Sequence, residues 1–214
     1  MLKILDIIFP PTCGSCGKIG KQWLCNKCNR SLRKSVNLKR FRLSKSLYVN
    51  YMFIYKDKLR EIILSYKVSE NSYLYRTFSD MIFKDTKARE LIDKFDYIIP
   101  APMYIDNKKK RGYNQTELIA KEIAKNTDVI YDNKILIKTK NNKTQSTLNE
   151  FERTQNIKNV YGIVNSEKIK NKKILLFDDI CTTGATVKEC YKELKKYAKE
   201  VTVLVLAKSN YKKG

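Results

Sequence analysis

The sequence contains no histidine among its 214 residues. This absence excludes a histidine-based catalytic triad, a histidine metal ligand and general-base catalysis by histidine. Any catalysis by the chain must therefore use carboxylates, lysine, tyrosine, cysteine or electrostatic stabilisation by fixed charges.

The sequence also lacks an apolar run long enough to span a bilayer. The N-terminal stretch MLKILDIIFPP is interrupted by Asp6, is shorter than the apolar part of a signal peptide and has no small-residue cleavage site before its prolines. The run VTVLVLA at 201–207 is far too short for a transmembrane helix. We therefore expect a cytoplasmic protein with no membrane insertion.

Positive charge is what the sequence has in excess. Its 44 lysines and arginines outnumber 22 acidic residues, which gives a formal net charge of +22. Such a charge attracts nucleic acid, anionic lipid or phosphorylated ligands. Lysine dominates, however, and asparagine, isoleucine and tyrosine are also abundant, as codon bias in an AT-rich genome would produce. The charge alone leaves DNA binding and compositional drift equally open.

Four cysteines near the N-terminus have the spacing C-x2-C-x8-C-x2-C, and they are Cys13, Cys16, Cys25 and Cys28. Each pair forms one tight turn that directs two thiolates to one point, which is typical of a tetrahedral zinc site. Two disulfides are the alternative, but they are uncommon without a secretory signal. A redox motif would need only one pair. We predict a structural Zn²⁺ site whose metal supplies most of the folding energy of this short segment.

Strands alternate with helices along the rest of the chain. The expected strands lie at 47–57, 96–103, 134–139, 172–177 and 201–208, and the expected helices at 58–67, 72–84, 87–94, 114–125 and 185–198. Asn114 and Glu117 have capping-box spacing at the start of one helix. The alternation predicts a parallel sheet covered by helices on both faces.

Two adjacent acids, Asp178 and Asp179, end an apolar strand in the segment ILLFDDICTTGAT. Ligands of parallel sheets bind beyond the carboxyl ends of the strands. The threonines and the glycine that follow offer hydroxyls and backbone amides, and they lead into a helix N-terminus, which favours phosphate. The Gly-x4-Gly-Lys pattern of a Walker loop is missing. A threonine-capped turn is the alternative, but it needs no paired acids. We interpret the segment as a sugar-phosphate site.

This segment resembles the phosphoribosyl diphosphate (PRPP) binding motif of type I phosphoribosyltransferases. By that resemblance Asp178 and Asp179 hold the ribose hydroxyls. The 5′-phosphate would be bound by Thr182, Thr183, Gly184, Ala185 and Thr186. The pyrophosphate loop of that fold follows an earlier strand, and IIPAPM, which contains Ala101, is the candidate. Mg²⁺ is expected to accompany PRPP.

Further segments are similar to the ComF family of competence proteins, ComFC type, along essentially the whole chain. They are IIFPPTCGSCG with CNKC, PAP, RGYNQTELIAKEIA, KTQSTLNEFERTQNIKNVYGI and DDICTTGAT. That family pairs a four-cysteine zinc module with a phosphoribosyltransferase-like domain and is associated with the handling of DNA after uptake in natural transformation. The resemblance also implies a competence helicase as a partner.

The expected fold class is therefore α/β. It comprises a type I phosphoribosyltransferase-like parallel sheet with helices on both faces and a small N-terminal four-cysteine zinc module. We expect residues 1–44 to contain an N-terminal helix, the zinc module and a basic connector. Residues 45–214 would form the phosphoribosyltransferase-like domain, with its core from about residue 95.

The segment KKKRGYNQ crowds positive charge beside a helix start, which suits a diphosphate or a DNA backbone. A solvated basic loop is equally compatible. The possible contacts to pyrophosphate or DNA are Ala101, Lys108, Lys109, Lys110, Arg111, Asn114, Gln115 and Arg153. Arg153 and Asn156 share a helix face that points either at the ligand cleft or at solvent.

Two functions are consistent with these patterns. The first is an accessory protein of DNA uptake that binds PRPP or a related ligand, with single-stranded DNA in a basic groove lined by aromatic residues. The second is an active phosphoribosyltransferase, in which Mg²⁺ and the basic loop stabilise the leaving pyrophosphate. No acceptor signature, glutaminase nucleophile or catalytic residue is evident. A DNA-binding regulator that senses PRPP is a third class, but no helix-turn-helix is apparent.

Overall fold

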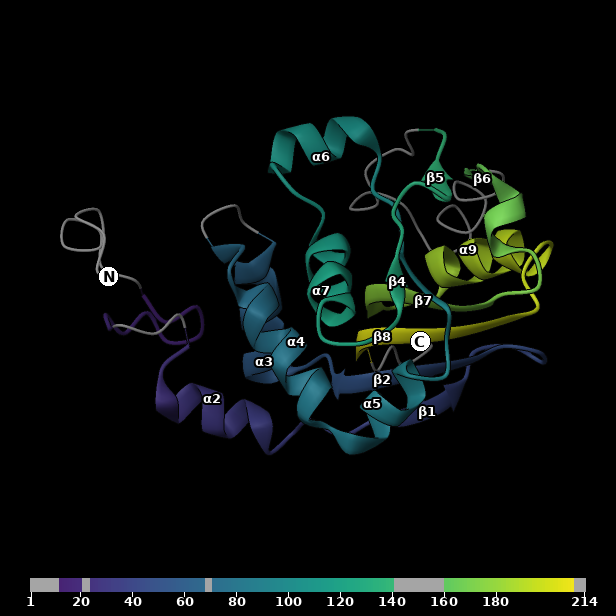
Figure 1. The fold of residues 1–214 in the computed structure, drawn as a ribbon. Coiled ribbons are helices and arrows are strands. Elements are labelled where there is room, and N and C mark those ends of the chain that lie inside the picture. Colours follow the sequence, from purple (N-terminus) through teal and green to yellow (C-terminus); the bar gives the residue numbers. More distant parts are fainter. Residues whose placement is uncertain (1–11, 21–23, 68–70, 141–159, 210–214) are drawn as a thin grey trace.

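The structure is a computed structural model that describes residues 12–20, 24–67, 71–140 and 160–209 (Figure 1). Its helices are α2 (Asn26–Arg33), α3 (Asp57–Tyr66), α4 (Leu74–Lys84), α5 (Thr86–Ile92), α6 (Ile105–Arg111), α7 (Gln115–Ala124), α9 (Ala185–Lys195) and the 3-10 helix η3 (Ser166–Ile169). Its strands are β1 (Lys39–Arg42), β2 (Tyr48–Ile54), β3 (Tyr97–Pro100), β4 (Ile130–Tyr131), β5 (Leu136–Lys138), β6 (Tyr161–Ile163), β7 (Lys173–Cys181) and β8 (Glu200–Lys208). No helix within these described segments is long and apolar enough to cross a membrane.

A six-stranded sheet forms the centre of the fold, with the strand order β1-β2-β8-β7-β3-β4. Neighbouring strands are parallel from β2 to β4, and β1 runs antiparallel to β2 at one edge. The parallel sheet that the alternation of strands and helices predicted is therefore confirmed.

Several strands differ from the sequence-based expectation, since β1, β4 and β6 were not predicted and one predicted strand lies outside the main sheet. The edge strand β1 comes from the predicted basic connector, whose charged residues show no apolar alternation. Polar side chains are tolerated there because an edge strand faces solvent on one side, and charge discourages pairing with other chains. The strand expected at 134–139 does not join the main sheet, because β5 pairs antiparallel with β6 in a separate two-stranded sheet.

Helices cover both faces of the main sheet, as the central strand β7 shows (Figure 1). Leu175 and Phe177 belong to one buried cluster with side chains of α3, α4, α5 and α7. Ile174 and Leu176 belong to a second cluster with side chains of α9. Successive residues of a strand point to opposite faces. Both faces of β7 are apolar because helices cover both of them.

Candidate functional site

The two adjacent acids lie inside strand β7, which extends to Cys181 and not merely to residue 177 as predicted. The neighbouring strand β3 ends opposite Phe177, and the Ala101 amide donates a final hydrogen bond of 2.8 Å to the Phe177 carbonyl. Beyond this point β7 stays paired with β8. Asp178 and Asp179 therefore lie at the opening where the chains of β3 and β7 separate, at the carboxyl edge of the sheet.

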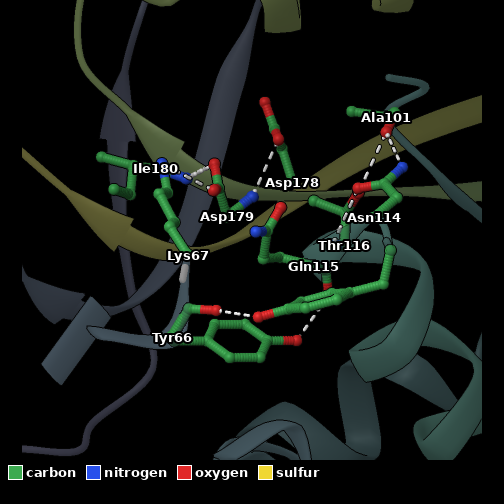
Figure 2. A network of polar contacts seen from close by, with 10 residues as sticks. Tyr66, Lys67, Ala101, Asn114, Gln115, Thr116, Asp178, Asp179 and Ile180 are labelled. Atoms are coloured by element: carbon green, nitrogen blue, oxygen red, sulfur yellow. Dashed lines mark hydrogen bonds and ion pairs between the residues drawn. The ribbon is translucent and has the colours of Figure 1, made fainter. Parts of the chain in front are cut away.

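The two carboxylates point in different directions (Figure 2). The Asp179 carboxylate accepts a hydrogen bond of 2.6 Å from the Ile180 amide and forms an ion pair of 2.9 Å with Lys67. The Asp178 carboxylate accepts a hydrogen bond of 2.8 Å from the Asp179 amide. The sequence did not indicate Lys67, because nothing in the local pattern distinguishes a lysine at the end of an amphipathic helix.

Asp178 is almost fully buried, with 7% of its surface exposed. Burial is the main reason that its pKa rises to about 7, and the charge of Asp179 adds to the rise, while the Asp179 amide and Lys67 oppose it. Burial and the nearby Asp178 charge also raise the pKa of the Cys181 thiol to about 12. Cys181 is therefore a neutral thiol at neutral pH, whereas the Asp178 carboxyl is about half protonated. A cation or a hydroxyl donor beside Asp178 would favour the ionised form.

The predicted phosphate loop connects β7 to α9. Its residues are Thr182, Thr183 and Gly184 in the connection and Ala185 and Thr186 at the start of α9. Gly184 has a φ of 76°, which side-chain-bearing residues rarely adopt. A Cβ there would lie 2.5 Å from Cδ1 of Leu43. The Thr183 hydroxyl accepts a hydrogen bond of 3.4 Å from the Ala185 amide. Hydroxyls and helix-terminal amides thus lie beside the acids, as a phosphate site requires.

Two tyrosines, Tyr113 and Tyr66, of which Figure 2 labels Tyr66 below the acids, connect the end of α3 to the start of α7. The Tyr66 hydroxyl donates a hydrogen bond of 2.8 Å to the Gln115 carbonyl. The Tyr113 hydroxyl donates to the Tyr66 carbonyl, and the two rings lie 6.1 Å apart. These contacts fix the backbone immediately before Lys67. The Ile180 amide holds the Asp179 carboxylate, so both partners of the ion pair are positioned.

Asn114 and Gln115, two of the predicted contact residues, are buried. Asn114 is the N-cap of α7, as predicted, but its side chain accepts a hydrogen bond from the Thr116 amide and donates one of 3.4 Å to the Glu117 carboxylate, which is not the pattern of a capping box. The Asn114 NH₂ group also donates to the Ala101 carbonyl at 3.2 Å, and the Thr116 hydroxyl donates to the same carbonyl at 3.0 Å. Asn114 thereby anchors the loop that follows β3.

The basic segment forms helix α6, where a loop was expected. The helix ends at Arg111, and Gly112, which caps it, has a φ of 84°. Lys108 forms an ion pair of 2.6 Å with Glu117, so part of its charge is neutralised, whereas Lys109 is exposed. The side chains of Lys110 and Arg111 lie outside the described part of the structure, as does the whole of Arg153.

The four N-terminal cysteines converge, with all four sulfur atoms within 4.8 Å of one another. The Sγ atoms of Cys16 and Cys25 are 3.8 Å apart. This matches the edge of about 3.8 Å expected for a tetrahedron with zinc–sulfur distances of about 2.3 Å. The cysteines are free thiols in the structure, and the Cys25 amide donates a hydrogen bond of 3.3 Å to the Cys13 sulfur. The residues present therefore fit a divalent metal with four thiolate ligands.

Burial and hydrogen bonding give the two buried thiols of this cluster, Cys13 and Cys28, different pKa values. Burial alone would raise the pKa of Cys13, but hydrogen bonds from the amides of Cys25, Ser15 and Cys16 outweigh it and lower the pKa to about 6. Burial raises the pKa of Cys28 to about 12. Four adjacent thiols cannot all ionise alone, so a bound cation would have to displace protons from the cluster.

The sequence is similar both to a domain family and to individual proteins named for competence or for DNA utilization. The family model described as phosphoribosyl transferase domain matches residues 88–214. Competence protein F of Haemophilus influenzae is 28% identical over 204 residues, which are 93% of this chain and 85% of that protein. Competence protein ComFC of Bacillus subtilis is 25% identical over 136 residues, which are 64% of this chain and 53% of that protein. DNA utilization protein YhgH of Escherichia coli K12 is 24% identical over 63% of this chain and 60% of that protein.

Among solved structures, a crystal structure of adenine phosphoribosyltransferase matches 85% of this chain and 88% of its own, with 15% identity and a TM-score of 0.44. The family model, together with the sheet and the cysteine cluster, confirms the predicted fold class. The named competence proteins confirm the resemblance to the ComF family.

Proposed function

The chain belongs to the phosphoribosyl transferase domain family, and on this premise we propose that it binds PRPP or a related phosphoribosyl ligand at the opening between β3 and β7. One observation carries the proposal. Asp178 and Asp179 lie beside the threonine- and glycine-containing loop at the carboxyl edge of a parallel sheet, where β3 ends and β7 continues. Folds of this kind bind their ligands at that edge.

In this proposal the acids and the loop have separate tasks. Asp178 and Asp179 accept hydrogen bonds from the ribose hydroxyls, and the hydroxyls and amides of residues 182–186 bind the 5′-phosphate. The backbone at Ala101 and the basic residues of α6 face the pyrophosphate, joined by Arg153. Carboxylates beside a diphosphate also suit Mg²⁺, which prefers oxygen ligands and commonly binds through substrate phosphates. When bound, Mg²⁺ would neutralise part of the pyrophosphate charge.

We assign the cysteine cluster to one structural Zn²⁺ ion. Four sulfur ligands and the tetrahedral spacing support zinc over metals that prefer oxygen. Cys13 and Cys28 are buried in the same apolar cluster as Leu59 and Ile62 of α3. The ion would therefore fasten the N-terminal segment to the helix that ends beside Asp179.

The relatives named for competence and for DNA utilization support a role in handling DNA that is taken up during natural transformation. We place this role in the cytoplasm, with single-stranded DNA as the nucleic-acid partner and a competence helicase as a protein partner. The net charge of +22 suits a polyanionic partner.

Catalytic transfer of the phosphoribosyl group is the second candidate function. It is favoured by the family match, which extends over both acids and the loop. Transfer would break the bond between the anomeric carbon and pyrophosphate and form a bond from that carbon to an acceptor. Positioning and electrostatic stabilisation can carry such a step without histidine.

The test is a calorimetric titration of the purified protein with PRPP and Mg²⁺, with pyrophosphate release followed in a panel of nucleobases. We expect binding that is lost in the Asp178→Asn, Asp179→Asn double variant. It should be retained in Asp93→Asn, because the Asp93 side chain is half-exposed and pairs with Arg89 at the end of α5. Binding without turnover supports the accessory role, and pyrophosphate release that depends on one base establishes transfer. Binding that is unchanged in the double variant would overturn the site.

A further inference from the structure

Helix α9 presents a row of lysines on one face. Lys188, Lys192 and Lys195 of the helix and its C-cap Lys196 follow the i, i+4, i+7, i+8 spacing that places residues on the same side. All four side chains are exposed. The opposite face of α9 is buried in the core through Val187, Cys190 and Leu194.

The lysine row borders a hollow of about 420 Å³. Its second wall is the turn between the edge strands β1 and β2, with Ser44, Ser46 and Leu47, and Tyr191 of α9 lies among the lining residues. Lysines therefore line one wall and hydroxyl groups the other.

A second hollow of about 290 Å³ adjoins the first, since both are lined by Ser46, Leu47 and Tyr191. It adds Arg40 and Tyr48 of the edge strands and Leu91 of α5. The Arg40 guanidinium stacks 4.0 Å from the centre of the Tyr48 ring. The Arg42 guanidinium lies 5.9 Å from the centre of the same ring, and Tyr48 is 41% exposed. The two hollows form one elongated surface, which we call the α9 groove.

The charge of the α9 groove is only partly neutralised. Lys196 pairs with Glu193 at 2.6 Å, and Glu200 lines the second hollow. Lys188 and Lys192 form no ion pair within the described segments of the chain. The groove thus combines uncompensated cations with tyrosine rings along its length.

This combination favours a flexible polyanion with flat groups over the other anionic partners. A small phosphorylated metabolite is usually held by buried polar groups in an enclosed pocket, whereas the lysines here are exposed. A helix that inserts into a membrane interface carries bulky exposed apolar residues, but Leu47 of the groove is buried. Lysines that follow a phosphate backbone and tyrosines on which bases stack are the features of single-strand binding without sequence preference.

We propose that the α9 groove binds single-stranded DNA, with the phosphates along the lysines of α9 and bases on Tyr48 and Tyr191. The inference rests on the DNA-handling role proposed above and assigns a surface to it. The groove begins one helical turn after the phosphate loop, since the Lys188 amide donates to the Gly184 carbonyl at 2.8 Å. Leu43 of the β1–β2 turn packs against Gly184. The bound DNA would therefore pass beside the phosphoribosyl site without occupying it.

The test measures fluorescence anisotropy of a labelled oligothymidylate over a series of NaCl concentrations. The Lys192→Gln, Lys195→Gln variant should bind about tenfold more weakly at low salt. Its slope of log affinity against log salt should be shallower by about 1.4, because each lost contact to a single strand contributes about 0.7. The matched control is Lys58→Gln, Lys121→Gln, which removes the same charge from exposed lysines of α3 and α7, neither of which lines the α9 groove. It should bind like the wild type.

The Tyr48→Leu variant tests separately whether DNA bases stack on this ring. It should weaken binding of oligothymidylate about tenfold and leave binding of an abasic strand unchanged, because stacking needs a base. Equal losses in the groove and control variants, no oligothymidylate binding by the wild type, or groove-dependent binding of an acidic peptide or phosphatidylserine vesicles in preference to DNA would each overturn the proposal. PRPP calorimetry on the Lys192→Gln, Lys195→Gln variant should match the wild type. Failure of PRPP binding and failure of the groove are thus distinguishable.

Discussion

Lys67 and Asp179 form an ion pair of 2.9 Å between the end of α3 and strand β7 (Figure 2). Both side chains are mostly buried, with 28% and 19% of their surfaces exposed. Lys67 therefore supplies positive charge to the acid pair in the ligand-free protein. Lys67 also opposes the rise in the pKa of Asp178, so one ammonium group pairs with Asp179 and favours the ionised form of Asp178.

Replacing Lys67 by methionine should raise the pKa of Asp178 above its value of about 7, because the charge that favours the ionised form is lost. Carbon-13 NMR of the Asp178 carboxyl over a pH series measures the change. The Lys56→Met variant removes the same charge from an exposed ion pair with Asp57 and should leave the titration unchanged. A midpoint that is the same in Lys67→Met and wild type would contradict the coupling.

Asp178 should make the ligand-free protein less stable as pH rises from about 4 to about 7. Its folded-state pKa is raised to about 7, whereas a carboxyl in the unfolded chain titrates near 4. Between these values the folded state holds more protons than the unfolded state, so stability falls with pH and is constant above the folded pKa.

Asp178→Asn should remove this dependence, since an amide oxygen can still accept the hydrogen bond from the Asp179 amide. We expect the free energy of unfolding at pH 8 to rise by about 1–3 kcal/mol, which is several degrees in Tm, and to change little at pH 4. Thermal unfolding at both pH values measures the difference, and Asp93→Asn is the control. Equal effects at both pH values would show that Asp178 is not protonated on folding.

Gly184→Ala should distort the predicted phosphate loop and destabilise the fold by about 1–3 kcal/mol. The residue has a φ of 76°, and its added Cβ would lie 2.5 Å from Cδ1 of Leu43. Adding Leu43→Ala should recover part of the loss by removing the contact, but not the cost of the backbone conformation. Gly20→Ala, whose Cβ would contact nothing within 4 Å, serves as the control in urea unfolding. If Gly184→Ala unfolds like Gly20→Ala, the loop is not constrained as described.

Local patterns in the sequence predicted the parts of the molecule that depend on local order. The apolar run of β7, the acids after it and the cysteine spacing each specify their own geometry, and the structure places them as a strand, an opening and a sulfur cluster. The Asn114 cap was predictable because it involves a residue two positions away.

Contacts between distant segments were not predictable in the same way. The pairing of Lys67 with Asp179 depends on how α3 packs against the sheet, and a single helix-terminal lysine carries no signal of it. Strand β1 was missed because an edge strand needs no apolar pattern. Helix α6 was missed because its sequence, IDNKKKR, has no apolar face. The α9 groove forms only when α9 meets the β1–β2 turn, although the lysine spacing in α9 was readable.

Removing the metal should unfold the cysteine segment and weaken its packing on α3. Cys13 and Cys28 share a buried cluster with Leu59 and Ile62 of that helix, and a segment this short depends on its metal for folding energy. We expect one zinc per chain in protein purified without chelator. In Cys16→Ser, which alters the exposed ligand, we expect well under one zinc per chain and a Tm several degrees lower.

Cys181→Ala is the control for metal content, because this buried thiol lies on β7, outside the sulfur cluster. It should retain one zinc. Two disulfides would predict the opposite pattern, with no metal in the wild type and a change in electrophoretic mobility on reduction. If chelator leaves the wild-type Tm unchanged, the metal does not hold this segment on α3. Loss of zinc with a lower Tm in Cys16→Ser alone would show that the four cysteines act as one structural site, which joins the N-terminal segment to the helix ending at Asp179.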